Sequence, residues 1–257
     1  MIKEIRIAIV GDSISQGLGS KLYNYSDELK KNIELQTSKK IIIKNFAFTG
    51  TTIKYANQIS GDVKSFNPDI ILSFYGNVDA MVRPKTTGKP NYYSLLPNRY
   101  KQNGMLDPRP FFSSKLLKRF FEHIDSYIRY NLKKLLMKLQ GTYCWVGLEE
   151  FRLEYQEFLD NIISSDRKIF LVSTVIVDGF YFPGTNENYF KYNKCIKDLA
   201  SRYNSTFLDV YNLLSKYEWS QVYGNDHFHP NLNGYTILAE YFAEELSKYI
   251  ISNPKIK

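Results

Sequence analysis

The chain has 257 residues, of which 44% are hydrophobic and 23% are charged, and its formal net charge is +8. This balance excludes an intrinsically disordered chain, and the length suits one α/β domain. No stretch reaches the roughly 18 uncharged apolar residues of a membrane-spanning helix, and residues 1–10 lack the apolar run of a secretion signal. We therefore predict a single domain over residues 1–257 and a cytoplasmic location.

Predicted strands and helices alternate along the chain. Short apolar or β-branched runs predict five strands, at residues 4–10, 41–48, 69–75, 168–175 and 206–210. Amphipathic segments predict helices at residues 17–35, 53–60, 149–164, 186–202 and 233–250. Such alternation forms a parallel sheet covered by helices on both faces, and ligands bind beyond the carboxyl ends of its strands. The predicted class is a three-layer α/β/α fold.

Residues 83–148 interrupt this alternation after the third predicted strand. Connections in such folds normally have a few residues, so we predict an inserted, mainly helical element here. The insertion also carries the positive charge of the chain, because residues 83–140 contain 13 Lys and Arg against 3 Asp and Glu. The remainder of the chain is therefore slightly negative.

An amphipathic basic helix, or a pair of them, is predicted within this insertion. Ten apolar side chains recur at helical spacing: Leu116, Leu117, Phe120, Phe121, Ile124, Ile128, Leu132, Leu135, Leu136 and Leu139. Most of the lysines and arginines lie off this stripe. Three roles are open: holding an acidic glycan, peripheral contact with an anionic membrane through residues 113–140, or packing of the stripe on the core or a second subunit. The oligomeric state stays open.

The segment Gly11-Asp12-Ser13 lies where the first predicted strand ends and a helix follows. Ser13 is thus expected at the carboxyl edge of the sheet, where helix-terminal N–H groups favour a developing negative charge. The alternative is that Asp12, Ser13 or Ser15 only caps the helix, as Asp and Ser often do. A catalytic role for Ser13 requires partners elsewhere in the chain.

Two of the three histidines lie in the segment 225–231, just before the last predicted helix. A serine hydroxyl is a weak nucleophile until a base takes its proton, and a carboxylate must orient that base. Asp226 precedes His229 by three residues and can orient it, whereas His227 is too close to Asp226 for easy pairing. The alternative is a solvated turn. We predict a triad of Ser13, His229 and Asp226.

Four segments together resemble the ordered motif blocks of SGNH (GDSL-like) hydrolases. They are G-D-S at 11–13, N-F-A-F-T-G-T-T at 45–52, Y-G-N-V-D-A at 75–80 and D-H-F-H-P-N at 226–231. The resemblance covers residues 1–82 and 149–250 and leaves the insertion unmatched. It implies a flavodoxin-like fold with a five-stranded parallel sheet, Ser13 as nucleophile, His229 as base and Asp226 as its orienting acid. It also implies an oxyanion hole made by the N–H groups of Ser13 and Gly50 and an Asn side chain.

The third donor of the oxyanion hole is where the sequence departs from the family pattern. The family usually reads Gly-x-Asn-Asp, whereas here Val78 stands at the Asn position and Asn77 lies one residue earlier. Loss of one such donor typically costs about 100- to 1,000-fold in rate. We predict Asn77 as the third donor; a backbone N–H in its place, or a slow enzyme, are the alternatives. Arg83 is predicted to bind an anionic substrate group, with a plain surface charge as its alternative.

These features predict a serine esterase that removes an O-acetyl or other small acyl group from a carbohydrate through an acyl-enzyme on Ser13. The same acyl-enzyme can be discharged by a sugar hydroxyl instead of water, so an O-acyltransferase is the first alternative. The second is a catalytically weakened glycan-binding homologue, which the altered Asn position favours.

No cofactor, metal or nucleic-acid partner is predicted. The glycines between residues 11 and 19 do not follow the order of a dinucleotide site or a P-loop. Cys144 and Cys195 form no ligand set with recognisable spacing, and the histidines are better used by the triad. The expected partner is a small-molecule or glycan ester.

Overall fold

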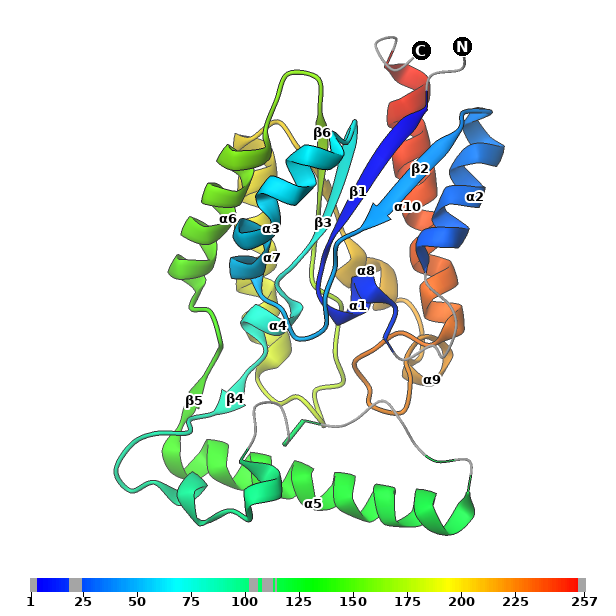
Figure 1. Ribbon diagram of the computed structural model, residues 1–257. Helices are drawn as coiled ribbons and strands as arrows, with labels where there is room; N and C mark the ends of the chain where they lie inside the picture. The colour runs from blue at the N-terminus through cyan, green and yellow to red at the C-terminus, as the bar shows by residue number, and fades with distance from the viewer. Residues whose placement is uncertain (1–3, 19–24, 102–105, 108–112, 114, 254–257) are drawn as a thin grey trace.

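A five-stranded parallel sheet forms the centre of the protein (Figure 1). The structure is a computed structural model that describes residues 4–18, 25–101, 106–107, 113 and 115–253. The strands are β1 (Ile5–Gly11), β2 (Ile41–Asn45), β3 (Ile70–Phe74), β6 (Lys168–Val172) and β7 (Thr206–Leu208). Their spatial order is β2-β1-β3-β6-β7, with every neighbouring pair parallel. This is the flavodoxin-like order, so the predicted fold class is confirmed.

Helices cover both faces of the sheet, which explains why the central strands are apolar throughout. They are α2 (Tyr25–Thr37) and α10 (Leu232–Ser252) on one face, and α3 (Ile53–Phe66), α6 (Leu148–Ile162) and α7 (Thr185–Arg202) on the other (Figure 1). Each buries one stripe: in α10, Leu238, Phe242 and Leu246 recur every four residues and are fully buried. All five residues of β3 are buried beneath these layers.

Several short helices on the carboxyl side of the sheet were not predicted from the sequence. They are α1 (Ser13–Gln16), α4 (Asn77–Ala80), α8 (Val210–Leu214) and α9 (Trp219–Val222). Helices of four or five residues are too short to show a period. The helix predicted over 17–35 was wrong at its start, because Gly17 has a φ of 87° and ends α1 as its left-handed C-cap. The next described helix begins at Tyr25.

The insertion leaves and rejoins the domain at one place, where β4 (Arg83–Pro84) pairs antiparallel with β5 (Thr142–Tyr143). Between them lie two short 3₁₀ helices, η1 (Tyr92–Leu95) and η2 (Asn98–Tyr100), and the long helix α5 (Leu116–Gln140). The predicted basic helix is thus one helix. It lies across the end of the molecule toward which the strands of the central sheet point (Figure 1).

The apolar stripe of α5 does not pack on the main core of the domain, and its packing on a second subunit stays a prediction. Only Leu132 and Leu136 join a small second core, in which Leu96, Tyr100 and Leu106 are also buried. The other stripe residues are exposed: Leu116, Leu117, Phe120, Phe121, Ile124, Ile128, Leu135 and Leu139. The buried side of α5 instead includes Arg129 and Lys133.

Asp107 neutralises two cations beneath α5. The ammonium group of Lys133, whose side chain is 1% exposed, pairs with Asp107 Oδ1, and Arg83 Nε lies 3.3 Å from Asp107 Oδ2. Burial alone would raise the pKa of Asp107, but the Lys133 and Arg83 charges outweigh it and hold that pKa below its usual value. These two ion pairs link α5, through Asp107, to Arg83 at the start of the insertion.

Asp107→Ala is expected to reduce the free energy of unfolding by about 3–5 kcal/mol, because it leaves the buried Lys133 charge without a partner. Urea unfolding of the purified protein measures this change. The double variant Asp107→Ala/Lys133→Met should recover the part of the loss that comes from Lys133, since it removes that charge together with its partner, while Arg83 lacks Asp107 in both variants. A loss below about 1 kcal/mol in the single variant would contradict the pairing.

Candidate active site at the carboxyl ends of the strands

Ser13 lies at the turn between β1 and α1. Asp12 is the N-cap of α1, and its Oδ1 accepts a hydrogen bond from Ile14 N–H at 2.9 Å. The turn requires glycine at position 11, because a Cβ there would lie 2.4 Å from Ser15 Oγ and 2.8 Å from the carbonyl oxygen of Phe74. Ser13 is therefore held at the first position of a helix, where backbone N–H groups have no partner within the helix.

The loop before α10 holds the proposed base and acid. It is closed by a bridge between Tyr223 and Pro230 and by a 2.8 Å hydrogen bond from Gly224 N–H to the carbonyl of His229. Asp226 Oδ1 accepts the N–H groups of Phe228 at 3.3 Å and His229 at 3.1 Å. The Asp226 carboxylate thus folds the loop as well as facing the imidazole.

A continuous chain of hydrogen bonds joins Asp226, His229 and Ser13. His229 Nδ1 lies 2.5 Å from Asp226 Oδ2, and His229 Nε2 lies 2.8 Å from Ser13 Oγ. Because the carboxylate only accepts, Nδ1 carries the proton and Nε2 is left to accept from the serine hydroxyl. All three residues are buried. The structure brings together the three residues of the predicted triad in the arrangement that activates a serine.

His227, the other histidine of the loop, does not face Ser13. Its ring stacks on Tyr181, with 4.2 Å between ring centroids, and its Nδ1 lies 3.0 Å from Asp178 Oδ2. It has a φ of 56°, which is uncommon for a residue with a side chain. The left-handed residue between Asp226 and Phe228 turns the chain so that His229, and not His227, points at the serine.

The loop that carries Gly50 is tied to the Ser13 turn. Phe48 N–H and the Thr51 hydroxyl each donate to the carbonyl of Gly11 at 3.2 Å, and Thr49 N–H donates to Gln16 Oε1 at 2.9 Å. Gly50 itself has a φ of 74° and is exposed. Neither its N–H nor that of Ser13 donates to any described residue. Both groups are available for an oxyanion.

The Asn77 side chain is buried and forms hydrogen bonds inside the protein. Its Oδ1 accepts Val175 N–H at 2.8 Å, its carbonyl accepts the Tyr189 hydroxyl at 2.6 Å, and its side chain is fully buried. The Asn77 carboxamide thus ties α4 to the segment after β6. Its role as the third oxyanion donor stays a prediction.

Asn77→Ala is expected to lower the free energy of unfolding by about 1–3 kcal/mol, because Val175 N–H loses its buried acceptor. If these structural contacts are the whole role of Asn77, kcat should change by less than about tenfold, whereas loss of an oxyanion donor would cost about 100-fold or more. Thermal unfolding and ester hydrolysis, measured on the same samples, separate the two effects. A loss of more than 100-fold in kcat at unchanged stability would instead assign the side chain to the oxyanion hole.

Two buried carboxyl groups below the site were not singled out from the sequence as functional. Asp79 Oδ1 accepts Ile53 N–H at 2.8 Å and its Oδ2 accepts Gly76 N–H at 3.0 Å, so it joins the start of α3 to α4. Burial raises the pKa of Asp79 to about 7 and that of Asp12 to about 6, against the hydrogen bonds that each accepts. Asp79 could have been found from the sequence, because it occupies the last position of the family's Gly-x-Asn-Asp pattern.

These raised pKa values predict that stability falls as the pH rises. Between pH 4 and 7 the folded protein holds protons on Asp79 and Asp12 that the unfolded chain has lost, so the free energy of unfolding decreases with pH in this range. Thermal unfolding from pH 5 to 8 should show the midpoint falling, and Asp79→Asn should flatten part of this fall. Parallel profiles for the two proteins would contradict the assignment.

Arg83 is engaged inside the protein. Its guanidinium donates to the carbonyl oxygens of Val78 at 3.1 Å and Met81 at 3.3 Å, pairs with Asp107, and stacks over the Trp145 ring at 4.0 Å. Its side chain is 9% exposed. This placement gives Arg83 a structural role in attaching the insertion, and its binding of a substrate anion stays a prediction.

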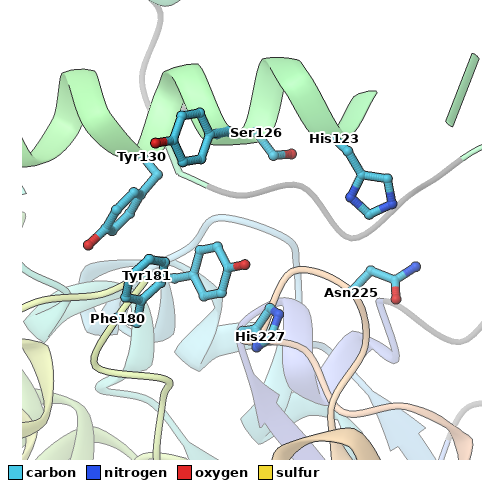
Figure 2. A pocket seen from close by; sticks show the side chains of 8 residues that line it. His123, Ser126, Tyr130, Phe180, Tyr181, Asn225 and His227 are labelled. Carbon is cyan, nitrogen blue, oxygen red and sulfur yellow. The ribbon is translucent and has the colours of Figure 1, made fainter. Parts of the chain in front are cut away.

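A cavity of about 290 Å³ lies between α5 and the loop of the proposed base (Figure 2). Tyr130 of α5 stacks on Phe180 at 4.5 Å between ring centroids, which closes one end. The lining side chains are His123, Ser126, Tyr127 and Tyr130 from α5, and Phe180, Tyr181, Asn225 and His227 opposite them. The insertion therefore forms one wall of a cavity whose other wall includes two residues of the His229 loop.

The described residues show neither a metal-ligand cluster nor a membrane-spanning helix. No group of three or more His, Cys, Asp or Glu side chains in the described ranges is arranged to hold an ion. None of the described helices is both long and apolar enough to cross a bilayer. Cys144 and Cys195 are free thiols, as predicted.

Comparisons with solved structures agree with the observed fold. A lipase/acylhydrolase from Enterococcus faecalis has a TM-score of 0.63 at 15% identity, covering 95% of this chain and 96% of that one. A catalytic mutant of the acetylxylan esterase Axe2 from Geobacillus stearothermophilus has a TM-score of 0.60 at 14% identity, covering 100% and 99%. LAE5, an alpha/beta hydrolase from the metagenome of Lake Arreo, Spain, has a TM-score of 0.59 at 16% identity, covering 97% of each chain. At such identities these likenesses concern the fold alone.

The sequence itself matches one family. No curated protein matches the chain. The profile of the GDSL-like Lipase/Acylhydrolase family matches residues 9–237, a range that includes Ser13, Asp226 and His229. This range also runs through the insertion, so the expectation that the insertion is unmatched is not confirmed. The chain belongs to the GDSL-like lipase/acylhydrolase family and is a serine esterase of the SGNH type.

Proposed function

We propose that the protein removes an O-acetyl or similar small acyl group from a carbohydrate, through an acyl-enzyme on Ser13. The observation that carries this proposal is the hydrogen-bonded chain from Asp226 through His229 to Ser13 Oγ. Family membership supports ester hydrolysis in general. Within that reaction class, the proposal takes Ser13 as the nucleophile, His229 as the base and Asp226 as the orienting acid, which the observed hydrogen bonds support.

In the acylation step, Ser13 Oγ attacks the carbonyl carbon of the ester while His229 Nε2 takes the hydroxyl proton. The carbonyl oxygen becomes an oxyanion, which the N–H groups of Ser13 and Gly50 stabilise. The bond between the carbonyl carbon and the sugar oxygen then breaks, and His229 returns its proton to that oxygen. Asp226 stabilises the imidazolium throughout.

In the deacylation step, water repeats the same sequence of proton transfers. His229 Nε2 takes a proton from water, which attacks the acyl carbon, and the proton passes to Ser13 Oγ as the acyl group leaves as a carboxylic acid. A sugar hydroxyl in place of this water would make the protein an O-acyltransferase, and the triad serves both reactions equally.

Two observations favour a carbohydrate as the acylated group. The cavity under α5 is lined by four aromatic rings, whose flat faces suit the C–H faces of sugar rings, and by polar groups of Ser126 and Asn225. Among similar folds, the Axe2 structures are named as acetylxylan or acetyl-xylooligosaccharide esterases. Acetylated xylo-oligosaccharides are therefore the first natural-type substrates to test.

The test compares acetate release from acetylated xylo-oligosaccharides with p-nitrophenol release from p-nitrophenyl acetate. Tyr127→Ala, which removes a ring that is 67% exposed in the cavity wall, should raise KM for the oligosaccharide and leave p-nitrophenyl acetate hydrolysis unchanged. The matched control is Tyr217→Ala, an exposed tyrosine outside the cavity lining. Equal KM values in all three proteins would contradict sugar binding in this cavity.

The same assay separates hydrolysis from transfer. Free xylo-oligosaccharide is added to the p-nitrophenyl acetate reaction, and products are identified by mass. We expect acetate as the main product; acetylated oligosaccharide in excess of acetate would show that the enzyme is a transferase. No turnover of either substrate by a folded protein would favour the glycan-binding alternative.

A further inference from the structure

The outward face of α5 carries exposed apolar side chains and cations but no acidic residue. Successive residues of a helix turn by 100°, so Leu117, Ile124 and Leu135 point in directions within roughly 20° of one another. Exposed apolar neighbours flank them: Leu116, Phe120, Phe121, Ile128 and Leu139. Exposed cations flank them: Lys138 lies beside this face and Lys134 lies at its edge. Along Leu116–Gln140, every residue of which is described, the carboxylates are Glu122 and Asp125, and neither is exposed.

The two acidic residues of α5 lie toward the protein instead. Asp125 pairs with Arg129 and accepts the Tyr100 hydroxyl at 2.8 Å, while Glu122 accepts Ser113 N–H. Burial is therefore inverted relative to an ordinary surface helix, which hides its apolar stripe and exposes its charges. An apolar face of this length on the outside of a protein marks a contact with something that excludes water.

The charges on the outward face of α5 distinguish between two possible partners, a second copy of the chain and a lipid surface. In a pair of identical faces, Lys134 and Lys138 would meet the same cations from the second copy, with no exposed carboxylate on either face to balance them. Like charges at close range repel. An anionic bilayer has negatively charged headgroups at its surface and apolar acyl chains beneath them. The headgroups can pair with the lysines of the face, and the acyl chains can cover its apolar side chains.

We propose that the outward face of α5 docks on an anionic lipid bilayer, with α5 lying in the plane of the interface. The 25 residues of α5 give a helix about 37 Å long. Leu117, Phe121 and Ile124 enter the acyl boundary, and Lys134 and Lys138 contact the headgroups. The opposite side of α5 lines the cavity, so that docking holds the cavity about one helix diameter, roughly 10 Å, from the lipid.

Co-sedimentation of the full chain with vesicles tests this proposal. The probes are vesicles of equal parts phosphatidylglycerol and phosphatidylcholine, and vesicles of phosphatidylcholine alone. We expect the protein to partition onto the anionic vesicles, less so as salt rises, and weakly onto the neutral ones. Phe120→Ser/Phe121→Ser should reduce the partition coefficient at least about tenfold. Lys134→Gln/Lys138→Gln should reduce it by about 25-fold, at roughly fivefold for each lysine.

Matched substitutions on α7 serve as controls. Phe190→Ser removes an aromatic ring that is 71% exposed, and Lys191→Gln/Lys194→Gln removes two exposed lysines from another helix. Both should bind vesicles as the natural protein does. All α5 variants should keep their thermal stability and p-nitrophenyl acetate hydrolysis, because the altered side chains are exposed and lie outside the catalytic site.

Three results would overturn the proposal: no binding of the natural protein to anionic vesicles, equal losses in the α7 controls, or a lipid-free dimer in light scattering that Phe120→Ser/Phe121→Ser dissociates. The last result would assign the face to a second copy of the chain. Ser13→Ala should bind vesicles normally, so a failure of docking and a failure of the proposed esterase mechanism are distinguished.

Discussion

Ser13→Ala is expected to lower kcat for p-nitrophenyl acetate by about 10⁴- to 10⁶-fold, with no loss of stability. The variant removes the hydroxyl oxygen that lies 2.8 Å from His229 Nε2 and that this nitrogen is placed to activate. His229→Ala should cost a similar factor, since the Ser13 hydroxyl then keeps its proton. The double variant should be no slower than the slower single variant, because the two side chains act as one unit.

Ser15→Ala is the matched control for these variants. Ser15 lies in the same short helix as Ser13 and is also buried, but no hydrogen bond joins it to His229 among the described residues. We expect it to change kcat by less than about tenfold. Circular dichroism and thermal unfolding show that each variant is folded before rates are compared. A Ser13→Ala protein with more than one tenth of the natural rate would contradict the assignment of the nucleophile.

Asp226→Asn is expected to lower kcat by about 10⁴-fold, although the new side chain has almost the same shape. The Asn amide would donate toward His229 Nδ1, which must then accept, and the imidazole proton would move to Nε2. In that tautomer Nε2 cannot take the proton of Ser13. The loss should appear in kcat more than in KM, because the acid does not contact the substrate.

Asp178→Asn provides the comparison, since Asp178 Oδ2 lies 3.0 Å from Nδ1 of His227, the other histidine of the same loop. It is expected to leave kcat within about threefold of the natural value, because His227 does not face Ser13. Equal losses in the Asp226 and Asp178 variants would mean that the loop as a whole, and not one oriented imidazole, controls the rate.

The parallel core could be predicted from the sequence because its strands are short apolar runs separated by amphipathic segments. The carboxyl ends of such strands share one edge, which is why Ser13 after β1 and His229 before α10 could be expected to meet. The offset at Asn77 and Val78 could not be resolved in the same way. Which side chain of α4 faces the substrate depends on the turn of a four-residue helix, and no periodicity defines it.

The orientation of α5 could not be predicted either. Helical spacing shows which side chains share a face, but not whether that face is turned to the core. Lys133 is buried because Asp107, 26 residues away, neutralises it, and a partner at that separation leaves no local pattern. The same holds for Arg83, whose surroundings come from Asp107 and Trp145.

Fluorophosphonate labelling followed by peptide mapping tests whether Ser13 is the activated nucleophile, because the reagent forms a covalent bond with activated serine hydroxyls far faster than with ordinary ones. A triad of Ser13, His229 and Asp226 predicts one adduct per chain, on Ser13, with labelling lost in Ser13→Ala and strongly slowed in His229→Ala and Asp226→Asn. An adduct on another residue, or ester hydrolysis that continues at the natural rate in protein fully labelled elsewhere, would contradict it.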